Sequence, residues 1–152
     1  MKTKGFTLVE IMIVVAIIAL LAAIAIPNLL RARLNANETA AQATLATISS
    51  SNVSYRSVNA LYGTIAQMAA AIPPYLDGTV GTAQTAGGKQ GYYFTSTGEE
   101  TANVYCVAAR PVLYQNTGNR AFCVSEDGVL RVADPDAAIA TRAECILLPA
   151  TQ

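Results

Sequence analysis

The longest apolar run in the chain constrains its fold most. Residues 6–26 are twenty-one consecutive residues that include one charged side chain, Glu10, and one other polar side chain, Thr7. As an α-helix that rises about 1.5 Å per residue, the run spans roughly 30 Å, the thickness of the hydrocarbon core of a bilayer. The sequence therefore predicts an N-terminal helix that can cross a membrane.

The residues on either side of this run indicate its orientation. Lys2 and Lys4 precede it, and basic residues favour the cytoplasmic side of a membrane. Arg31 and Arg33 follow it and weaken this preference. We expect the N-terminus in the cytoplasm and the body of the chain outside it.

An ordinary secretory signal peptide is the alternative interpretation of this N-terminus. The Ala-Ile-Ala sequence at residues 23–25 would supply the small residues of its cleavage site. The run is longer than the roughly 7–15 residues of a typical signal-peptide core, however, and Glu10 would be a poor choice inside one. We therefore favour a helix that stays in the mature protein.

Composition excludes several classes of function. The 152 residues fit one domain, and ten basic against ten acidic side chains leave no basic surface for nucleic acid. Histidine, the commonest metal ligand and general base, is absent. Asp127, Asp134 and Asp136 are better explained as turn carboxylates than as calcium ligands. We expect no metal, no cofactor, no nucleic-acid partner and no enzyme; a secreted or membrane-anchored enzyme or binding domain is the remote alternative.

Helical periodicity continues beyond the apolar run. Pro27 lacks an amide hydrogen and is expected to kink the helix locally. Apolar residues then recur at spacings built from threes and fours, which places them on one helix face away from Glu38. They are Leu30, Leu34, Ala41, Leu45, Ile48, Tyr55 and Tyr62. With Gly63 as its C-cap, one helix is predicted from about residue 6 to residue 62, apolar first and amphipathic later.

The rest of the chain has turn and strand character. Residues 63–91 are rich in glycine and proline and form a predicted loop with room for a short helix at 64–71. Four short runs then favour strands, and Asp127-Gly128 between the last two is a hairpin signal. The runs are 92–96, 103–110, 120–125 and 129–132. We expect an α+β fold in which the amphipathic half-helix covers an antiparallel sheet of three to four strands within residues 92–132, followed by an irregular tail at 133–152.

The N-terminal residues resemble a known signal. Lys4-Gly5-Phe6-Thr7-Leu8-Val9-Glu10, followed by the apolar helix and Pro27, resembles the class III signal peptide of type IV pilins and type II secretion pseudopilins. The resemblance covers residues 1 to about 34 closely, and the remainder only in the architecture of a pilin fold. It implies a leader, residues 1–5, that a prepilin peptidase removes after Gly5 before it methylates the new amine of Phe6.

The resemblance also implies an organisation and a function. Residues 6–27 would be the membrane and filament-core helix, and residues 28–152 the globular pilin domain, with its helix at 28–62. The chain would be a precursor in the inner membrane that the pilus assembly machinery polymerises, through the N-terminal helices, into a surface type IV pilus. A type II secretion pseudopilin is the alternative, less favoured because no loop resembles the calcium segment of major pseudopilins. The sequence does not distinguish a role in adhesion, twitching motility or DNA uptake, and it does not distinguish a major from a minor pilin.

Glu10 is the most informative residue. A carboxylate in hydrocarbon costs several kcal/mol unless it is paired, so its presence there indicates a function. The apolar segment supplies one cation, the amine that cleavage would release on Phe6, one helical turn away. The resemblance implies that this amine pairs with Glu10 of a neighbouring subunit and sets the register of assembly. Glu10 reaching to the membrane surface is the alternative.

Three cysteines, Cys106, Cys123 and Cys145, lie in the part of the chain expected outside the cytoplasm. An oxidising compartment would allow one disulfide and leave one free thiol. If the hairpin between the second and third strands turned at residues 114–115, Cys106 and Cys123 would lie opposite each other. Cys145 competes for either partner and would tie the tail to the sheet. All three pairings among these cysteines stay open at this point.

Overall fold

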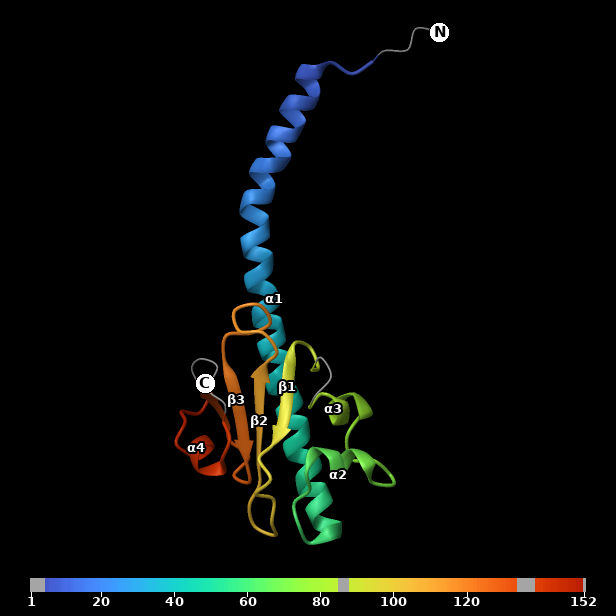
Figure 1. Cartoon of the computed structure of the whole chain (residues 1–152), viewed down its shortest axis with the longest axis vertical. Helices are drawn as coiled ribbons and strands as arrows, with labels where there is room; N and C mark the ends of the chain where they lie inside the picture. Colours follow the sequence, from blue (N-terminus) through green and yellow to red (C-terminus); the bar gives the residue numbers. More distant parts are fainter. Residues whose placement is uncertain (1–4, 85–87, 134–138, 152) are drawn as a thin grey trace. The chain divides into compact units, whose positions relative to one another are not determined.

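The structure is a computed structural model that describes residues 5–84, 88–133 and 139–151 (Figure 1). The leader residues before Gly5, and Asp134 and Asp136, lie outside these described ranges. The chain divides into two compact units, Met1–Arg33 and Leu34–Gln152, which we call unit 1 and unit 2.

Helix α1 (Leu8–Asn59) is the long helix that the periodicity predicts, slightly shorter at both ends. It includes Pro27 within its length, and the local kink there stays a prediction. The helix ends because Ala60 takes a left-handed conformation, with φ 60°, and donates its N–H to the carbonyl of Arg56. Gly63 is therefore not the C-cap; a Cβ at Gly63 would lie 2.8 Å from the ring of Tyr55, so close packing requires the glycine.

Four strands of unit 2 form one antiparallel sheet in the order β1-β2-β3-β4. They are β1 (Tyr92–Ser96), β2 (Cys106–Pro111), β3 (Ala121–Ser125) and β4 (Leu130–Ala133). The turn between β3 and β4 contains the predicted Asp127-Gly128 pair, and Gly128 has φ 71°, which favours glycine. The α+β fold with an antiparallel sheet is thus confirmed.

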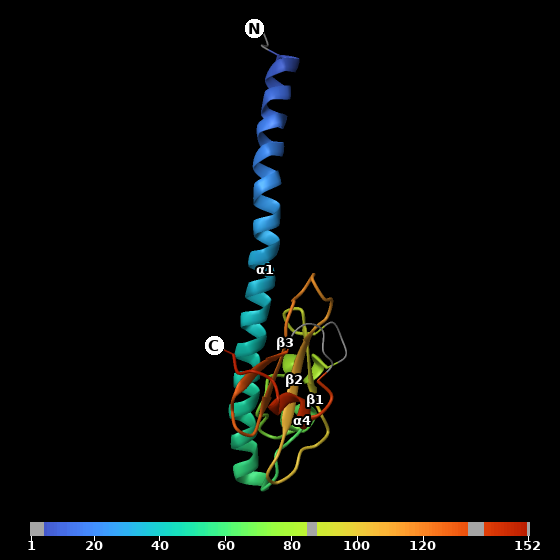
Figure 2. The ribbon, with the colours of Figure 1, turned by 90° about the vertical axis from the view of Figure 1, so that its left-hand side faces the viewer.

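The second half of α1 covers one face of this sheet (Figure 2). Ala41, Leu45 and Ile48 of the predicted apolar face are at most 1% exposed. They join one core with sheet residues that point to the same side, namely Tyr92, Phe94, Val107, Ala109, Phe122 and Val124. Each large side chain buried in this way contributes about 1.5–3 kcal/mol, so this contact is a major source of the stability of unit 2.

Glu38 is the exception to the predicted helix face, because it is only 4% exposed. Its Oε2 lies 2.6 Å from the Nη2 atom of Arg120, and its Oε1 accepts the N–H of Asn119 at 2.9 Å. The neighbouring Asn37 donates its side-chain N–H to the carbonyl of Thr117 at 2.9 Å. The loop of residues 112–120 between β2 and β3 is therefore fastened to α1. We call this end of unit 2, which contains Leu34, the stem end, and the opposite end of the strands the far end.

Short helices occupy the segment before the sheet. Helix α2 (Ile65–Ala70) forms where a short helix was expected, with a capping box between Thr64 and Gln67. Helix α3 (Gly78–Thr82) follows and was not expected; Asp77 caps it. Next to α3, the carbonyl of Ala83 accepts the N–H of Phe94, so this segment also runs along the outer edge of β1.

The C-terminal segment covers part of the other face of the sheet. This segment contains helix α4 (Arg142–Ile146) where an irregular tail was expected, and α4 packs against β3 and β2 (Figure 2). Further along, the N–H of Val132 bonds to the carbonyl of Pro149, and the N–H of Thr151 to that of Leu130. The segment therefore also pairs with the free edge of β4.

A disulfide joins Cys123 of β3 to Cys145 of α4, with their Cα atoms 6.0 Å apart. The alternative between Cys106 and Cys123 does not form, because the register pairs Cys123 with Ala108 and Cys106 with Ser125. The hairpin turns one residue later than that alternative required. Cys106 is a buried free thiol, and burial raises its pKa to about 12, which keeps it protonated and unreactive.

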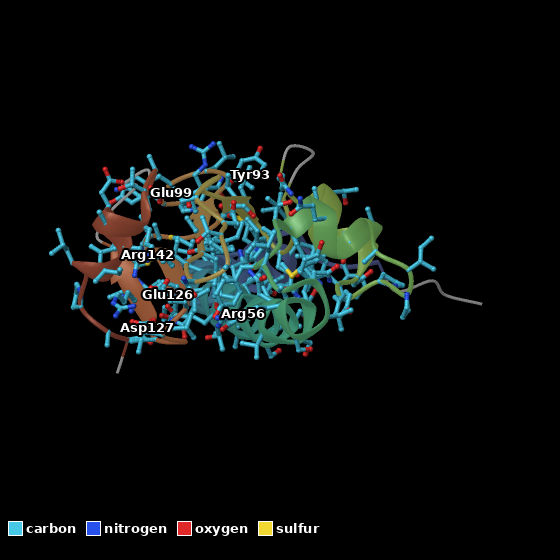
Figure 3. The ribbon with its side chains drawn as sticks, turned by 90° about the horizontal axis from the view of Figure 1, so that it is seen from below. Arg56, Tyr93, Glu99, Glu126, Asp127 and Arg142 are labelled. Atoms are coloured by element: carbon cyan, nitrogen blue, oxygen red, sulfur yellow. A yellow bond between two sulfur atoms is a disulfide. The ribbon has the colours of Figure 1, made fainter. Side chains whose placement is uncertain are left out.

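Two ion pairs lie at the far end (Figure 3). The guanidinium of Arg142 bonds to Glu126, and the backbone N–H of Arg142 donates to Glu99 at 2.6 Å, so both carboxylates hold the start of α4. Arg131 pairs with Asp127 within the β3–β4 hairpin. Hydrogen bonding from Arg131 lowers the pKa of the Asp127 carboxyl to about 2.

We expect Cys145→Ser to destabilise unit 2 by about 3 kcal/mol, because a disulfide across a loop of this length restricts the unfolded chain by about that amount. Urea unfolding of the purified protein in detergent measures the change. Cys106→Ala is the control, since it leaves the disulfide in place and should cost less. Non-reducing peptide mapping that finds Cys106 in the bond would contradict the assignment.

We expect Asp127→Asn to lower stability at pH 7 but not at pH 2. The pKa of Asp127 falls from about 3.8 to about 2 on folding. Its contribution is therefore present above pH 4 and is lost as the pH falls through 2. The difference in urea midpoint between the two proteins, measured across this range, checks the prediction. In an Arg131→Gln background the same substitution should show a much weaker pH dependence; an unchanged one would refute the role of the ion pair.

Candidate processing and assembly site

The predicted cleavage site lies in an extended segment just before α1. Gly5 and Phe6 have no regular secondary structure, and the Phe6 side chain is 86% exposed. A Cβ placed on Gly5 would meet no atom within 4 Å. Packing inside the chain therefore does not require glycine at this position, whereas a narrow external cleft that binds the backbone would.

Thr7 and Glu10 form a capping box at the start of α1. The Oε2 of Glu10 accepts the backbone N–H of Thr7 at 2.9 Å and its hydroxyl at 2.7 Å. The hydroxyl oxygen of Thr7 in turn accepts the N–H of Glu10 at 3.2 Å. These bonds satisfy amides that every helix start leaves unpaired. Sequence reasoning missed this role, although a threonine three residues before a glutamate at the start of an apolar run is its usual signature.

The predicted partner of Glu10 depends on cleavage. While Gly5 is attached, the nitrogen of Phe6 is an uncharged amide and cannot form an ion pair. Among the residues that the structure describes, none forms an ion pair with Glu10. In the uncut chain the carboxylate is therefore held by Thr7. Removal of the leader would place a cation one residue before this cap.

The predicted site residues do not all lie together. Gly5, Phe6 and Glu10 are neighbours, and with Thr7 they line a shallow open recess. Pro27 lies inside α1, and the three cysteines belong to unit 2. Within residues 5–84, 88–133 and 139–151, no three His, Cys, Asp or Glu side chains are grouped so that they could hold a metal ion.

Within residues 5–33, the part of unit 1 that the structure describes, no other segment covers the apolar part of α1. By length and composition it is suited to cross a membrane, and none of its most apolar stretch is buried inside the structure. Its large side chains, among them Ile11, Val15, Ile18, Leu21 and Ile24, are each at least half exposed. Exposure of so large an apolar surface to water is energetically unfavourable, so lipid or other helices must cover it.

Comparison with known proteins concerns the same end of the chain. Residues 1–26 match the family model of the prokaryotic N-terminal methylation motif. The chain is 61% identical over 44 residues to the type IV wide pilus major component PilA4 of Thermus thermophilus, a match that covers 29% of this chain and 34% of that protein. It is 40% identical over 65 residues to the type IV major pilin protein PilA of Myxococcus xanthus, covering 43% of this chain and 30% of that protein. The matches thus span about a third of the length of these curated relatives.

Proposed function

We propose that the chain is a structural subunit of a type IV pilus, because residues 1–26 match the N-terminal methylation motif and the N-terminal segment is similar to that of two type IV pilins. In this proposal a prepilin peptidase cuts after Gly5 and methylates Phe6. The assembly machinery then moves the subunit from the inner membrane into a surface filament. The role is structural and not enzymatic.

The exposed apolar helix carries the proposal. A single helix without charge from Ile11 to Leu30 is stable in lipid, and a bundle of like helices offers it an equivalent environment. Small side chains let such helices approach closely. They are Ala16, Ala19, Ala22, Ala23 and Ala25. One surface can therefore serve the membrane-bound precursor and the polymer in turn.

Glu10 links the two stages. In the uncut chain its carboxylate is neutralised in part by the hydrogen bonds from Thr7, which lowers the cost of keeping it near lipid. After cleavage the amine of Phe6 offers a charge of opposite sign. Between parallel helices displaced along their axes, that amine can meet Glu10 of a neighbour and fix the displacement. A carboxylate and an amine buried together are stable only as a pair.

We expect the mature protein to lack residues 1–5 and to carry one added methyl group on Phe6, because the basic leader and the apolar helix bracket Gly5. Intact-mass measurement of protein sheared from cells checks both changes. Eight basic side chains should remain against ten acidic ones, since Lys2 and Lys4 are lost from ten. Recovery of peptides with Lys2 or Lys4 from assembled filaments would refute this processing.

We expect Glu10→Ala to abolish surface filaments while membrane insertion and cleavage continue. The substitution removes a costly carboxylate from lipid, so the precursor stays anchored. It also leaves the Phe6 amine unpaired in an apolar core, at a cost of about 3–5 kcal/mol for each subunit. Shearing and electron microscopy of cells that express the variant measure filament number.

Thr7→Val is the matched control, because it removes the capping hydroxyl and keeps the charge of Glu10. It should cost about 1 kcal/mol of helix stability and leave filaments present. Normal filaments with Glu10→Ala would show that apolar packing alone sets the register. Filaments that appear in the periplasm and not at the surface, even in the unaltered strain, would favour the pseudopilin instead.

A further inference from the structure

The loop between β2 and β3 exposes two large apolar side chains side by side. Leu113 is 56% exposed and Tyr114 is 41% exposed. Both follow directly from the end of β2 at Pro111. They are not part of the core of unit 2, so they are available for contact with another surface.

This loop is a rigid platform. The hydroxyl of Thr117 bonds to the backbone of Leu113 on both sides, accepting its N–H at 3.0 Å and donating to its carbonyl at 3.1 Å. The N–H of Gln115 bonds to the carbonyl of Gly118 at 3.0 Å. Asn37 and Glu38 fasten the base of the loop to α1, as described above. The two apolar side chains are therefore held outward by a fixed backbone.

The connection between the apolar run and this loop is short enough for the loop to reach the membrane surface. Leu30 is the last residue before Arg31, the first charged residue beyond the apolar run. Asn37, which contacts the loop, is only seven residues further along the chain. Seven residues span about 10 Å as helix, and at most about 25 Å in a fully extended chain. The headgroup layer on each side of a bilayer adds roughly 5–8 Å to its hydrocarbon core. A connection of about 10 Å, close to the depth of that layer, lets the loop reach the headgroups.

The side chains at the stem end suit a headgroup surface. Tyrosine and leucine beside arginine are typical of the boundary between lipid and water. The exposed Arg110 packs on the ring of Tyr93 at this end, and Arg120 is about half exposed. At the far end the three carboxylates of Glu99, Glu126 and Asp127 outnumber the guanidinium groups of Arg131 and Arg142 that pair with two of them, and an anionic surface would repel the excess negative charge. Of the two ends, the stem end is the one that fits lipid.

We propose that residues 112–118 rest on the headgroup layer of the membrane that holds α1, with Leu113 and Tyr114 as the inserted side chains. This inference rests on the proposed function, because it requires a membrane-anchored subunit. The contact would orient unit 2 before the subunit leaves the bilayer, and extraction would have to break it.

Single-tryptophan fluorescence in nanodiscs tests the proposal, since the chain has no tryptophan of its own. Full-length Tyr114→Trp is placed at one copy per disc, and quenching by lipid with a spin label on its headgroup is measured. Val129→Trp, at the far end and 37% exposed, is the matched control. We expect the tryptophan at position 114 to lose most of its fluorescence and the one at position 129 to keep it. Leu113→Trp should behave like Tyr114→Trp.

Several outcomes would overturn the proposal. Equal quenching at positions 114 and 129, or none at 113 and 114, would show that the loop does not touch lipid. A change in tryptophan fluorescence at positions 113 and 114 that appears only in discs with several subunits would show that the loop contacts another copy of the protein and not lipid. An intact disulfide between Cys123 and Cys145 in each variant checks folding. A negative result in discs that retain the protein would leave the proposed filament function standing, because cleavage and surface filaments test it separately.

Discussion

The apolar surface of the first half of α1 is the constraint on which the rest of the structure depends. Among the described residues of its own unit nothing buries that surface, so lipid or other helices are needed to keep it from water. Unit 2, in contrast, closes its own core between the second half of α1, the sheet and the C-terminal segment. One helix thus meets two environments, and its residues change character where the first unit gives way to the second.

The polar contacts follow from this division. At the start of α1, the backbone N–H and the hydroxyl of Thr7 both donate to the carboxylate of Glu10. At the start of unit 2, Glu38 is buried because Arg120 and a backbone N–H meet both of its oxygens. Removing one partner from such a buried group costs more than the bond itself contributes. Glu10 thus lies where the helix itself begins, and Glu38 lies where the helix begins to contact the rest of unit 2.

Local patterns predicted most of the fold, and long-range contacts account for what they missed. The helix and the four strands follow from periodicity and turn residues, which are visible within a few positions. The burial of Glu38 could not be predicted, since its partner Arg120 is 82 residues away. The disulfide could not be assigned either, because a shift of one residue in the position of the turn within the 112–120 loop decides whether Cys123 faces Ala108 or Cys106. At the site, the cap formed by Thr7 could have been predicted from the sequence. At the other end of α1, the stop at Ala60 and the close packing of Gly63 on Tyr55 became visible only in the structure.

Both edges of the sheet are bonded to other parts of unit 2, which limits their contact with other molecules. The C-terminal segment lies beside β4, and the segment at Ala83 lies beside β1. A bare sheet edge offers unpaired N–H and carbonyl groups that can capture a strand from another molecule. Here backbone bonds from Pro149 and Thr151 occupy groups along β4, and the carbonyl of Ala83 occupies one on β1. Strands of other molecules that collide with unit 2 therefore meet edges on which some of the backbone groups are already bonded. For a filament subunit, as proposed above, this leaves the uncovered helix as the surface through which copies would associate.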